Sequence, residues 1–313
     1  MDSQPRARLA PRFSVVIPTF NRAETVCRAV ECVLRQAYPA GEVIVVDDGS
    51  RDATRERIEA FGEQVRYLYQ DNAGAASARN RGAAEARFPW LAFLDSDDIW
   101  FPSYLEQMAA AIEGTDGAAV VYFSDAEFEE FSPPQNRWAR VGFEAGAPYE
   151  LLKDAVDIVL AEGQPMLLPF SVFQRSAYLA VGGLWERLPA GEDTHLFVRL
   201  GLVNPMCAVP VLGGVVKGVP EEEGRLTGAF GPRAIQHWDC SVLLWNDILE
   251  RTPNLAPPRR RLFIRRIADA YWRKSILALK QHKLLSAARS LGRSFMHDPS
   301  VAFQAAARKI GKR

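Results

Sequence analysis

The sequence predicts an α/β fold in which a mostly parallel sheet carries helices on both faces and a C-terminal α-helical appendage follows. Three observations predict it. Short apolar runs alternate with segments of helical spacing over residues 13–125. Polar clusters rich in Asp, Asn, Thr and Gly follow four of these runs. Beyond Pro257 and Pro258 the pattern is purely helical.

Five apolar runs have the length and content of buried strands, and they cover residues 13–17, 42–46, 65–69, 90–94 and 118–123. The segments between them predict helices at residues 23–37, 52–61, 75–87 and 102–112. In the first helix the apolar residues share one face, formed by Val26, Ala29, Val30, Val33 and Leu34. Strands that alternate with helices of this length favour a parallel sheet covered on both faces.

The later part of the chain is less regular until its basic end. Strand character returns at residues 166–173 and 208–217, with a predicted helix at residues 192–203 between them. Amphipathic helices are predicted at residues 261–281, 284–295 and 301–310. Residues 259–313 contain fifteen Lys/Arg and two Asp/Glu, although the whole chain is neutral. Such a segment is typical of a membrane-surface helix, a helix that docks on the acidic remainder, or a solvated cap. It lacks a nucleic-acid reader motif, so we expect no nucleic-acid partner.

The composition favours a cytoplasmic protein. Cys27, Cys32, Cys207 and Cys240 form no CxxC pair, and we expect them to be reduced. The N-terminal residues lack the apolar region of a signal peptide. No apolar run reaches the roughly 18 residues that span a bilayer. Any membrane contact is therefore expected to be peripheral, at the inner face of the cell membrane.

The polar clusters lie where the predicted sheet would bind a ligand, because open α/β sheets bind ligands beyond the carboxyl ends of their strands. The acidic run DSDD at residues 95–98 follows the fourth strand. On such a turn, Asp95 and Asp97 can face one cleft, and Mg²⁺ is usually held by one or two carboxylates together with substrate phosphates. The alternative is an acidic first helical turn, stabilised by the helix dipole.

Three further clusters each allow a functional and a structural interpretation. Asp47 and Asp48 could accept hydrogen bonds from a nucleobase or ribose, or could form a turn and helix cap. Thr19 and Asn21 could likewise cap the following helix. The run QDNAGAASARNRGAAEA contains small residues that allow close backbone approach, and either Arg79 or Arg81 could hold a diphosphate. A buried Ala-rich helix with a solvated arginine is the alternative.

The run AGEDTHLFVRL places Glu192 and Asp193 after a glycine, at a predicted helix start. A carboxylate there could act as general base on an acceptor hydroxyl. It could equally be a first-turn acid that interacts with the helix dipole. His195 is more simply explained as a packed or exposed histidine than as a ligand.

Four runs in this order resemble family 2 glycosyltransferases with the GT-A fold, over roughly residues 13–212: VVIPTFNRAETVCRAVECVLRQAYPAGEVIVVDDGSRDAT, QDNAGAASARNRGAAEA, WLAFLDSDDIW and GGLWERLPAGEDTHLFVRL. The resemblance implies an inverting transferase that moves a sugar from a nucleotide diphosphate donor, usually UDP-linked, to an acceptor hydroxyl, in cell-surface polysaccharide or glycoconjugate biosynthesis. It also implies a division of the chain into an N-terminal tail (1–12), a nucleotide-sugar-binding half (13–125), an acceptor-side half (126–220) and a basic helical C-terminal region (221–313).

The resemblance also implies roles for individual residues. The uridine would be held by Thr19, the Asp47/Asp48 pair and Arg79, while Asp95 would contact the ribose. Asp97, with Asp95, would ligate the Mn²⁺ or Mg²⁺ that carries the diphosphate. Asp193 would take the acceptor proton, with Glu192 beside it. The donor-binding set is completed by Pro18, Asn21, Arg22, Asn72 and Ser96.

One departure concerns the loop after the last strand, where many relatives carry a histidine. The corresponding run KGVPEEEGRLTGAF has none, so the third metal contact is open, and Glu221 to Glu223 are possible substitutes. Two rivals remain. A non-catalytic sugar-nucleotide-binding protein would lack the Glu192/Asp193 pair, and a nucleotidyltransferase would carry a Gly-rich basic loop where PTFNR stands. The donor sugar and the acceptor, whether glycan, lipid-linked or protein, stay open.

Overall fold

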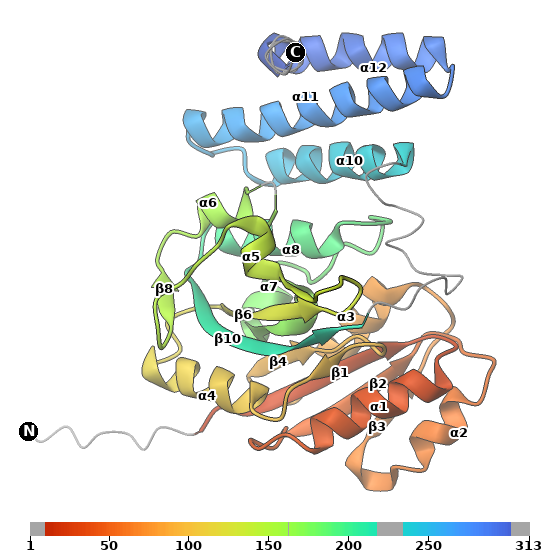
Figure 1. The fold of residues 1–313 in the computed structure, drawn as a ribbon, viewed down its shortest axis with the longest axis vertical. Helices are drawn as coiled ribbons and strands as arrows, with labels where there is room; N and C mark the ends of the chain where they lie inside the picture. Colours follow the sequence, from red (N-terminus) through yellow and green to blue (C-terminus); the bar gives the residue numbers. More distant parts are fainter. Residues whose placement is uncertain (1–9, 162, 218–233, 302–313) are drawn as a thin grey trace, which may run out of the picture. The chain divides into compact units, whose positions relative to one another are not determined.

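The first half of the chain alternates strands and helices as the apolar pattern predicts. The computed structural model describes residues 10–161, 163–217 and 234–301 (Figure 1). Its first strands are β1 (Phe13–Thr19), β2 (Glu42–Asp47), β3 (Arg66–Tyr69) and β4 (Trp90–Phe93). The helices between them are α1 (Ala23–Leu34), α2 (Thr54–Glu59), the short 3-10 helix η1 (Gly62–Gln64) and α3 (Ala75–Glu85). Then follow β5 (Ile99–Trp100), α4 (Tyr104–Gly114) and β6 (Val121–Phe128).

The sheet order reverses beside β1. The order is β3-β2-β1-β4-β9-β6-β10-β5, and the pairs β3–β2, β2–β1 and β1–β4 are parallel. The chain runs outward from β1 through β2 to β3 and then crosses to β4 on the other side of β1. Such a reversal of strand order is the topological switch point at which α/β sheets bind ligands. The predicted parallel α/β arrangement is confirmed for this half.

Helices cover both faces of this parallel region because its side chains alternate in direction. Val15 and Ile17 on β1 belong to the same buried cluster as Val26, Ala29, Val30 and Val33 of α1. Leu34, predicted on that face, is 37% exposed, because it is the last residue of α1. Val16 points to the opposite face, where a Cβ on Gly82 of α3 would lie 2.3 Å from its Cγ1. The glycine therefore lets α3 pack close to β1.

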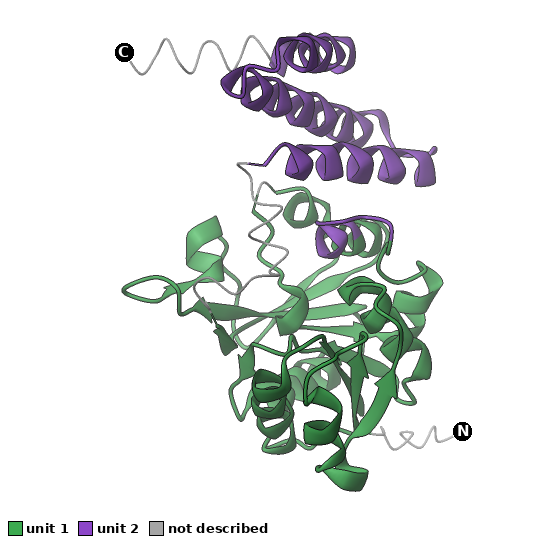
Figure 2. Cartoon of the chain, turned by 90° about the vertical axis from the view of Figure 1, so that its right-hand side faces the viewer, with its two compact units in different colours: residues 1–186, 196–220 green, residues 187–195, 221–313 purple. Residues whose placement is uncertain are grey.

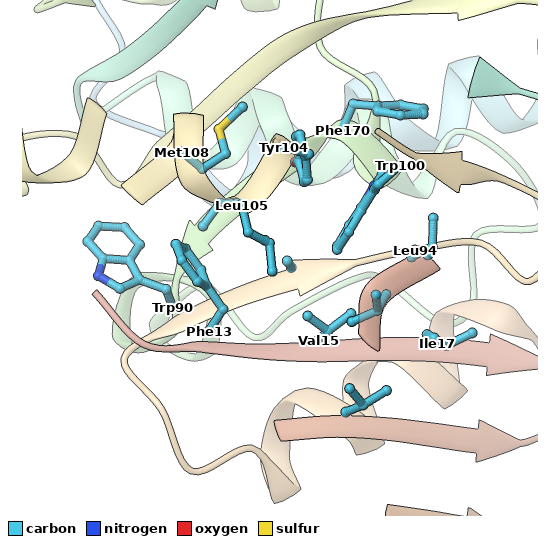
Figure 3. Packing of buried hydrophobic residues seen from close by; sticks show 14 of the residues in the cluster. Phe13, Val15, Ile17, Trp90, Leu94, Trp100, Tyr104, Leu105, Met108 and Phe170 are labelled. Carbon is cyan, nitrogen blue, oxygen red and sulfur yellow. The ribbon is translucent and has the colours of Figure 1, made fainter. Parts of the chain in front are cut away.

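An aromatic group anchors α4 in this core. The Trp100 and Tyr104 ring centroids are 4.5 Å apart, and Phe170 packs edge-on against Tyr104 at 6.4 Å. The Trp100 indole Nε1 donates to the Pro169 carbonyl at 2.6 Å, which satisfies its buried polar atom. Trp100 and Leu105 point toward the strand that carries Val15 (Figure 3). These contacts fix the segment that directly follows the acidic run at residues 95–98.

The second half completes the sheet with both parallel and antiparallel pairings. Its elements are β7 (Gln135–Asn136), α5 (Arg137–Val141), β8 (Glu150–Leu152), α6 (Val156–Val159), η2 (Leu168–Phe170), β9 (Ser171–Gln174), α7 (Arg175–Ala180), α8 (Glu192–Gly201) and β10 (Met206–Val216). β9 is antiparallel to both β4 and β6. The strand predicted at residues 166–173 is thus only partly correct, because Pro169 lies in a 3-10 turn and extended backbone begins at Ser171. The predicted GT-A type α/β fold is confirmed.

The described residues of the C-terminal region form the helices α10 (Ile235–Arg251), α11 (Pro257–Lys280) and α12 (Leu284–His297). The chain divides into two compact units, residues 1–186 with 196–220, and residues 187–195 with 221–313 (Figure 2). The second unit thus joins the C-terminal helices to a short segment from the middle of the chain. Among the described residues, no helix combines the length and the apolarity that crossing a bilayer requires.

Candidate functional site

The loops that follow β1 and β2 are joined by hydrogen bonds. Asn21 has a left-handed backbone, with φ 52°. Its N–H donates to Ser50 Oγ at 2.8 Å, and its Oδ1 accepts from the Arg51 N–H at 2.8 Å. Thr19 ends β1 and is buried, and within the described residues its Oγ1 has no hydrogen-bond partner. A buried hydroxyl without a partner is costly, so Thr19 Oγ1 is a candidate contact for a ligand.

Asp47 and Asp48 are buried carboxylates that hold this site together. Asp47 accepts from the Ser50 N–H at 2.8 Å and from the Tyr67 hydroxyl at 2.7 Å. Burial and this bond to Asp47 raise the pKa of Tyr67 well above its usual range. Asp48 accepts from Gln70 Nε2 at 2.7 Å and from two backbone amides: Ala73 N–H at 2.9 Å and Gly74 N–H at 2.8 Å.

These bonds fix the loop between β3 and α3. The Asp48 carbonyl also accepts from Asn72 Nδ2 at 2.9 Å, so the loop is held along its length. Asp48 Oδ1 already accepts two bonds, whereas Asp48 Oδ2 and both Asp47 oxygens each accept one of these bonds and have a lone pair for a further donor. Asp47 thus forms the expected turn and Asp48 fixes the loop between β3 and α3, and the binding of a ligand by either carboxylate stays a prediction.

Arg79 is the cation that α3 places beside the acidic run. It is 7% exposed and forms an ion pair with Asp95. The close packing of Gly82 on Val16 sets the height of α3 above the sheet and so places Arg79 at this point. Arg81 donates instead to the Tyr69 carbonyl at 2.6 Å. Of the two arginines that the sequence left open, Arg79 is the one at the candidate site.

The acidic run forms a turn whose carboxylates have separate partners. The Asp98 N–H donates to the Asp95 carbonyl at 3.0 Å, which closes the turn, and Ser96 is buried inside it. Arg22, from the loop after β1, lies 2.6 Å from Asp97. Asp98 Oδ1 accepts from the Lys217 N–H at 3.1 Å, so Asp98 fixes the end of β10. Asp95 and Asp97 are thus the two carboxylates that face basic side chains from separate segments.

The chemistry of this turn fits the protein's share of a divalent-cation site. Two hard carboxylates, Asp95 and Asp97, are enough where substrate phosphates complete the coordination sphere. Within the described part of the chain, no three His, Cys, Asp or Glu side chains gather as a site made by the protein alone. Arg22 and Arg79 supply positive charge there, which favours an anionic phosphate ligand. Residues 221–223, considered for a further metal contact, lie outside the described residues.

Glu192 and Asp193 begin α8 and belong to the second unit. Asp193 Oδ1 accepts from the Thr194 N–H at 2.6 Å, and both acidic residues are partly exposed. They are therefore accessible acids on a first helical turn. Their role toward the donor site stays a prediction.

Sequence reasoning missed two supporting residues. Asp52, at the start of the helix predicted at residues 52–61, accepts from the Ala23 N–H at 3.2 Å and so caps α1. His195, to which no role was assigned, is fully buried and bonded to Asp247 at 2.7 Å. The strand-end position of Asp52 offered a weak signal in the sequence. The partner of His195 lies 52 residues away, and no local pattern indicates it.

Comparisons with known proteins agree with this geometry. The family model described as "Glycosyl transferase family 2" matches residues 14–171, just over half of the chain. A validoxylamine A glucosyltransferase from Streptomyces hygroscopicus subsp. jinggangensis is 40% identical over 151 residues, which cover 42% of this chain and 36% of that protein. The first matching curated relatives are covered over 32% to 60% of their own length.

Two solved structures share the fold. TarS (residues 1–349) from S. aureus has a TM-score of 0.67 at 18% identity, covering 92% of this chain and 81% of that chain. A mannosyltransferase from Pyrobaculum calidifontis, in complex with GDP-Man and Mn²⁺, has a TM-score of 0.57 at 18% identity, covering 100% of this chain and 84% of that chain. With the family model, the switch-point site and this shared fold in agreement, the chain belongs to glycosyl transferase family 2.

Proposed function

We propose that this chain is a glycosyltransferase that moves a sugar from a nucleotide diphosphate donor, a UDP-sugar, onto an acceptor hydroxyl with inversion. The observation that carries the proposal is the cluster at the carboxyl ends of β1, β2 and β4, where Arg79 pairs with Asp95 and Arg22 pairs with Asp97. TarS has also been solved with UDP-GlcNAc, which supports a nucleotide-sugar donor. The Glu192/Asp193 pair favours a catalytic over a merely binding protein.

In this proposal the donor lies along the switch point. Thr19, Asp47, Asp48 and Arg79 hold the uridine, and Asp95 contacts the ribose. The unpartnered Thr19 Oγ1 and the buried Arg79 beside the site support these assignments. The neighbouring loop residues complete the donor-binding set, namely Pro18, Asn21, Arg22, Asn72 and Ser96. A ligand there would exchange part of the existing ion pairs for its own phosphate and ribose contacts.

A divalent cation, Mn²⁺ or Mg²⁺, would be held by Asp97 and Asp95. When bound, such a cation supplies positive charge to the departing diphosphate. The mannosyltransferase with the shared fold binds Mn²⁺, which supports this assignment. Arg22 would lose its partner Asp97 when the cation enters, and its guanidinium would then be available to the diphosphate.

The chain's own residues would perform the transfer as a single displacement. The acceptor oxygen attacks the anomeric carbon as the bond from that carbon to the diphosphate oxygen breaks. The hydroxyl proton passes to the Asp193 carboxylate, which acts as general base. Because attack and departure occur on opposite faces of the sugar, the configuration inverts and no covalent enzyme intermediate is needed.

A panel of nucleotide sugars tests the proposal. We expect one donor class to be hydrolysed slowly by the full chain with Mn²⁺ or Mg²⁺, and not with EDTA. A donor that binds in calorimetry but is never consumed, with any acceptor, would favour the sugar-nucleotide-binding rival. Release of a sugar 1-phosphate with transfer of the nucleotidyl group, in place of release of a nucleoside diphosphate, would favour the nucleotidyltransferase.

The C-terminal helices suit an acceptor at the inner face of the cell membrane, such as a lipid-linked or cell-surface glycan. On α12, Leu284 is 68% exposed, Leu285 is 88% exposed and Met296 is 85% exposed. Exposed basic residues, Lys283 and Arg289, lie beside them. Apolar side chains flanked by cations favour anionic bilayers. Flotation with anionic vesicles tests this, and equal recovery with neutral vesicles would count against it.

A further inference from the structure

One face of α10 holds the turn that carries Glu192 and Asp193. Three positions spaced four and three residues apart share that face: Cys240, Leu244 and Asp247. Burial raises the pKa of the Cys240 thiol, and the Ala190 backbone amide beside the sulfur acts in the opposite direction. A Cβ on Gly191 would lie 3.4 Å from Leu244 Cδ1, which is ordinary van der Waals contact.

The third contact is a buried polar pair. His195 is fully buried, and its Nε2 lies 2.7 Å from Asp247 Oδ2. Burial raises the pKa of Asp247, but bonds from Arg251 and His195 lower it more, so the carboxyl is ionised. An ionised carboxylate only accepts hydrogen bonds, so His195 Nε2 carries the hydrogen. Arg251 Nε binds the same oxygen at 2.5 Å from the solvent side.

The geometry of the turn links this pair to Asp193. Gly191 has a φ of 83°, which favours glycine, and its carbonyl accepts from the His195 N–H at 2.9 Å in the first bond of α8. Residues two apart on a helix point about 200° apart. His195 therefore faces α10 while Asp193 points away from it, and a rotation of the first turn would move both side chains together.

We propose that His195 and Asp247 are positioning residues for the general base. The His195–Asp247 hydrogen bond, together with the Cys240 and Leu244 contacts, fixes the rotation of the first turn of α8 and hence the direction of Asp193. This inference rests on the proposed function, in which Asp193 takes the acceptor proton. It assigns to α10, from the C-terminal region, a part in the transfer reaction.

The test uses Asp247→Ala in the full chain, with two readouts. The first is steady-state transfer: because a small misplacement of a catalytic group slows reaction sharply, we expect kcat to fall on the order of 10- to 100-fold, with the donor KM within about twofold of wild type. The second is hydrogen exchange at the amides of residues 192–196, which we expect to quicken while those of β1 and β4 stay unchanged.

Three further variants separate positioning from loss of stability. Ser294→Ala removes another buried hydrogen bond of the same unit, from Ser294 Oγ to the Ala268 carbonyl at 2.8 Å. It should lower the melting temperature by as much as Asp247→Ala while kcat stays near wild type. Arg251→Ala removes only the outer partner of Asp247 and should lower kcat less than threefold. Asp247→Asn keeps an acceptor for His195 and should restore part of the lost rate.

Each outcome decides the question. Unchanged exchange at residues 192–196, or an unchanged kcat, overturns the proposal. So does an equal fall in kcat for Ser294→Ala. A wild-type chain that transfers no sugar, while Asp247→Ala still quickens exchange, contradicts the proposed function rather than the anchoring of the turn.

Discussion

The strand-end loops of the first unit and the turn at residues 187–195 of the second unit are held in different ways. The loops after β1 and β2 bond to each other directly, as in the bonds from Asn21 to Ser50 and Arg51. The turn before α8 is held by a helix that lies some 50 residues further along the chain, through His195 and Asp247. Sheet topology and bonds between neighbouring loops therefore assemble the proposed donor-binding residues, whereas the turn that carries the proposed base contacts one distant helix.

The largest effect that follows from this comparison is at the base. Asp193→Asn keeps the size and the Oδ1 acceptor that bonds Thr194 but cannot take a proton. General base catalysis contributes about 10²- to 10⁴-fold, so we expect the transfer rate to fall by about 10³-fold while UDP affinity stays unchanged. Initial rates and calorimetry measure the two quantities. Glu192→Gln is the matched control with a smaller loss, and wild-type turnover by Asp193→Asn would remove it from this role.

The next effect is on the stability of the donor half. Asp48→Ala removes a buried carboxylate that accepts from the Ala73 and Gly74 amides, and hydrogen bonds to a charged group contribute about 1.5–3 kcal/mol. We expect urea unfolding to show a loss of about 3 kcal/mol. Asp71→Ala, an exposed carboxylate of the same loop, should change the free energy of unfolding by less than about 0.5 kcal/mol. Equal effects of the two variants would contradict the structural role of Asp48.

A smaller effect tests the packing that places Arg79. In Gly82→Ala the new Cβ meets Val16 Cγ1 at 2.3 Å, and overpacking of this kind costs about 1–3 kcal/mol. Gly292→Ala on α12 meets nothing within 4 Å and should stabilise its helix by up to about 1 kcal/mol. We expect thermal unfolding to give a lower melting temperature for Gly82→Ala and a higher one for Gly292→Ala than for the wild type. A stabilising Gly82→Ala would show that α3 has room above β1.

The smallest effect concerns the cap that Asp52 provides for α1. Burial raises the pKa of Asp52, but bonds from Thr54 and Ala23 lower it more, so its pKa is below the usual value. A carboxyl whose pKa is lowered by folding stabilises the folded state at pH values above its unfolded pKa of about 3.9. This stabilisation is lost as the pH falls through the pKa of the folded state. Relative to Asp52→Asn, we expect the wild type to have a free energy of unfolding about 0.5–1 kcal/mol higher at pH 7, and this difference is lost once the pH falls below the lowered pKa of Asp52. A difference in the free energy of unfolding that does not depend on pH would contradict the capping role of the Asp52 carboxylate.

The sequence predicted the parts of the molecule that short stretches of neighbouring residues determine. The strands at β1, β2, β3 and β4, the helices between them and the polar residues that follow each strand all come from short patterns. Arg79 could not be separated from Arg81 by pattern, since the choice depends on how closely Gly82 packs on Val16. The 3-10 turn at Pro169 was likewise hidden in an apolar run. α10 was not among the predicted elements, because its buried face is mixed, with Asp247 beside Leu244 and Ile248.

The pairing of His195 with Asp247 could not be derived from sequence for a related reason. A histidine on a helix start is usually packed or solvated, and only the contact with a helix 52 residues away gives it a partner. The same contact groups residues 187–195 with the C-terminal helices. A residue's role that depends on a tertiary contact between segments so far apart in the sequence can be assigned only from a structure.

The central claim is that Asp97, with Asp95, forms the protein's part of a cation–diphosphate site. The most direct measurement is calorimetry of UDP binding with Mn²⁺ and with EDTA. It compares the wild-type chain with Asp97→Ala and with a control, Asp98→Asn. The control alters the neighbouring carboxylate, which accepts a hydrogen bond from the Lys217 N–H. We predict that Mn²⁺ strengthens UDP binding by at least about tenfold (about 1.4 kcal/mol) in the wild type and in Asp98→Asn, and has no effect in Asp97→Ala. An undiminished Mn²⁺ effect in Asp97→Ala would contradict the account.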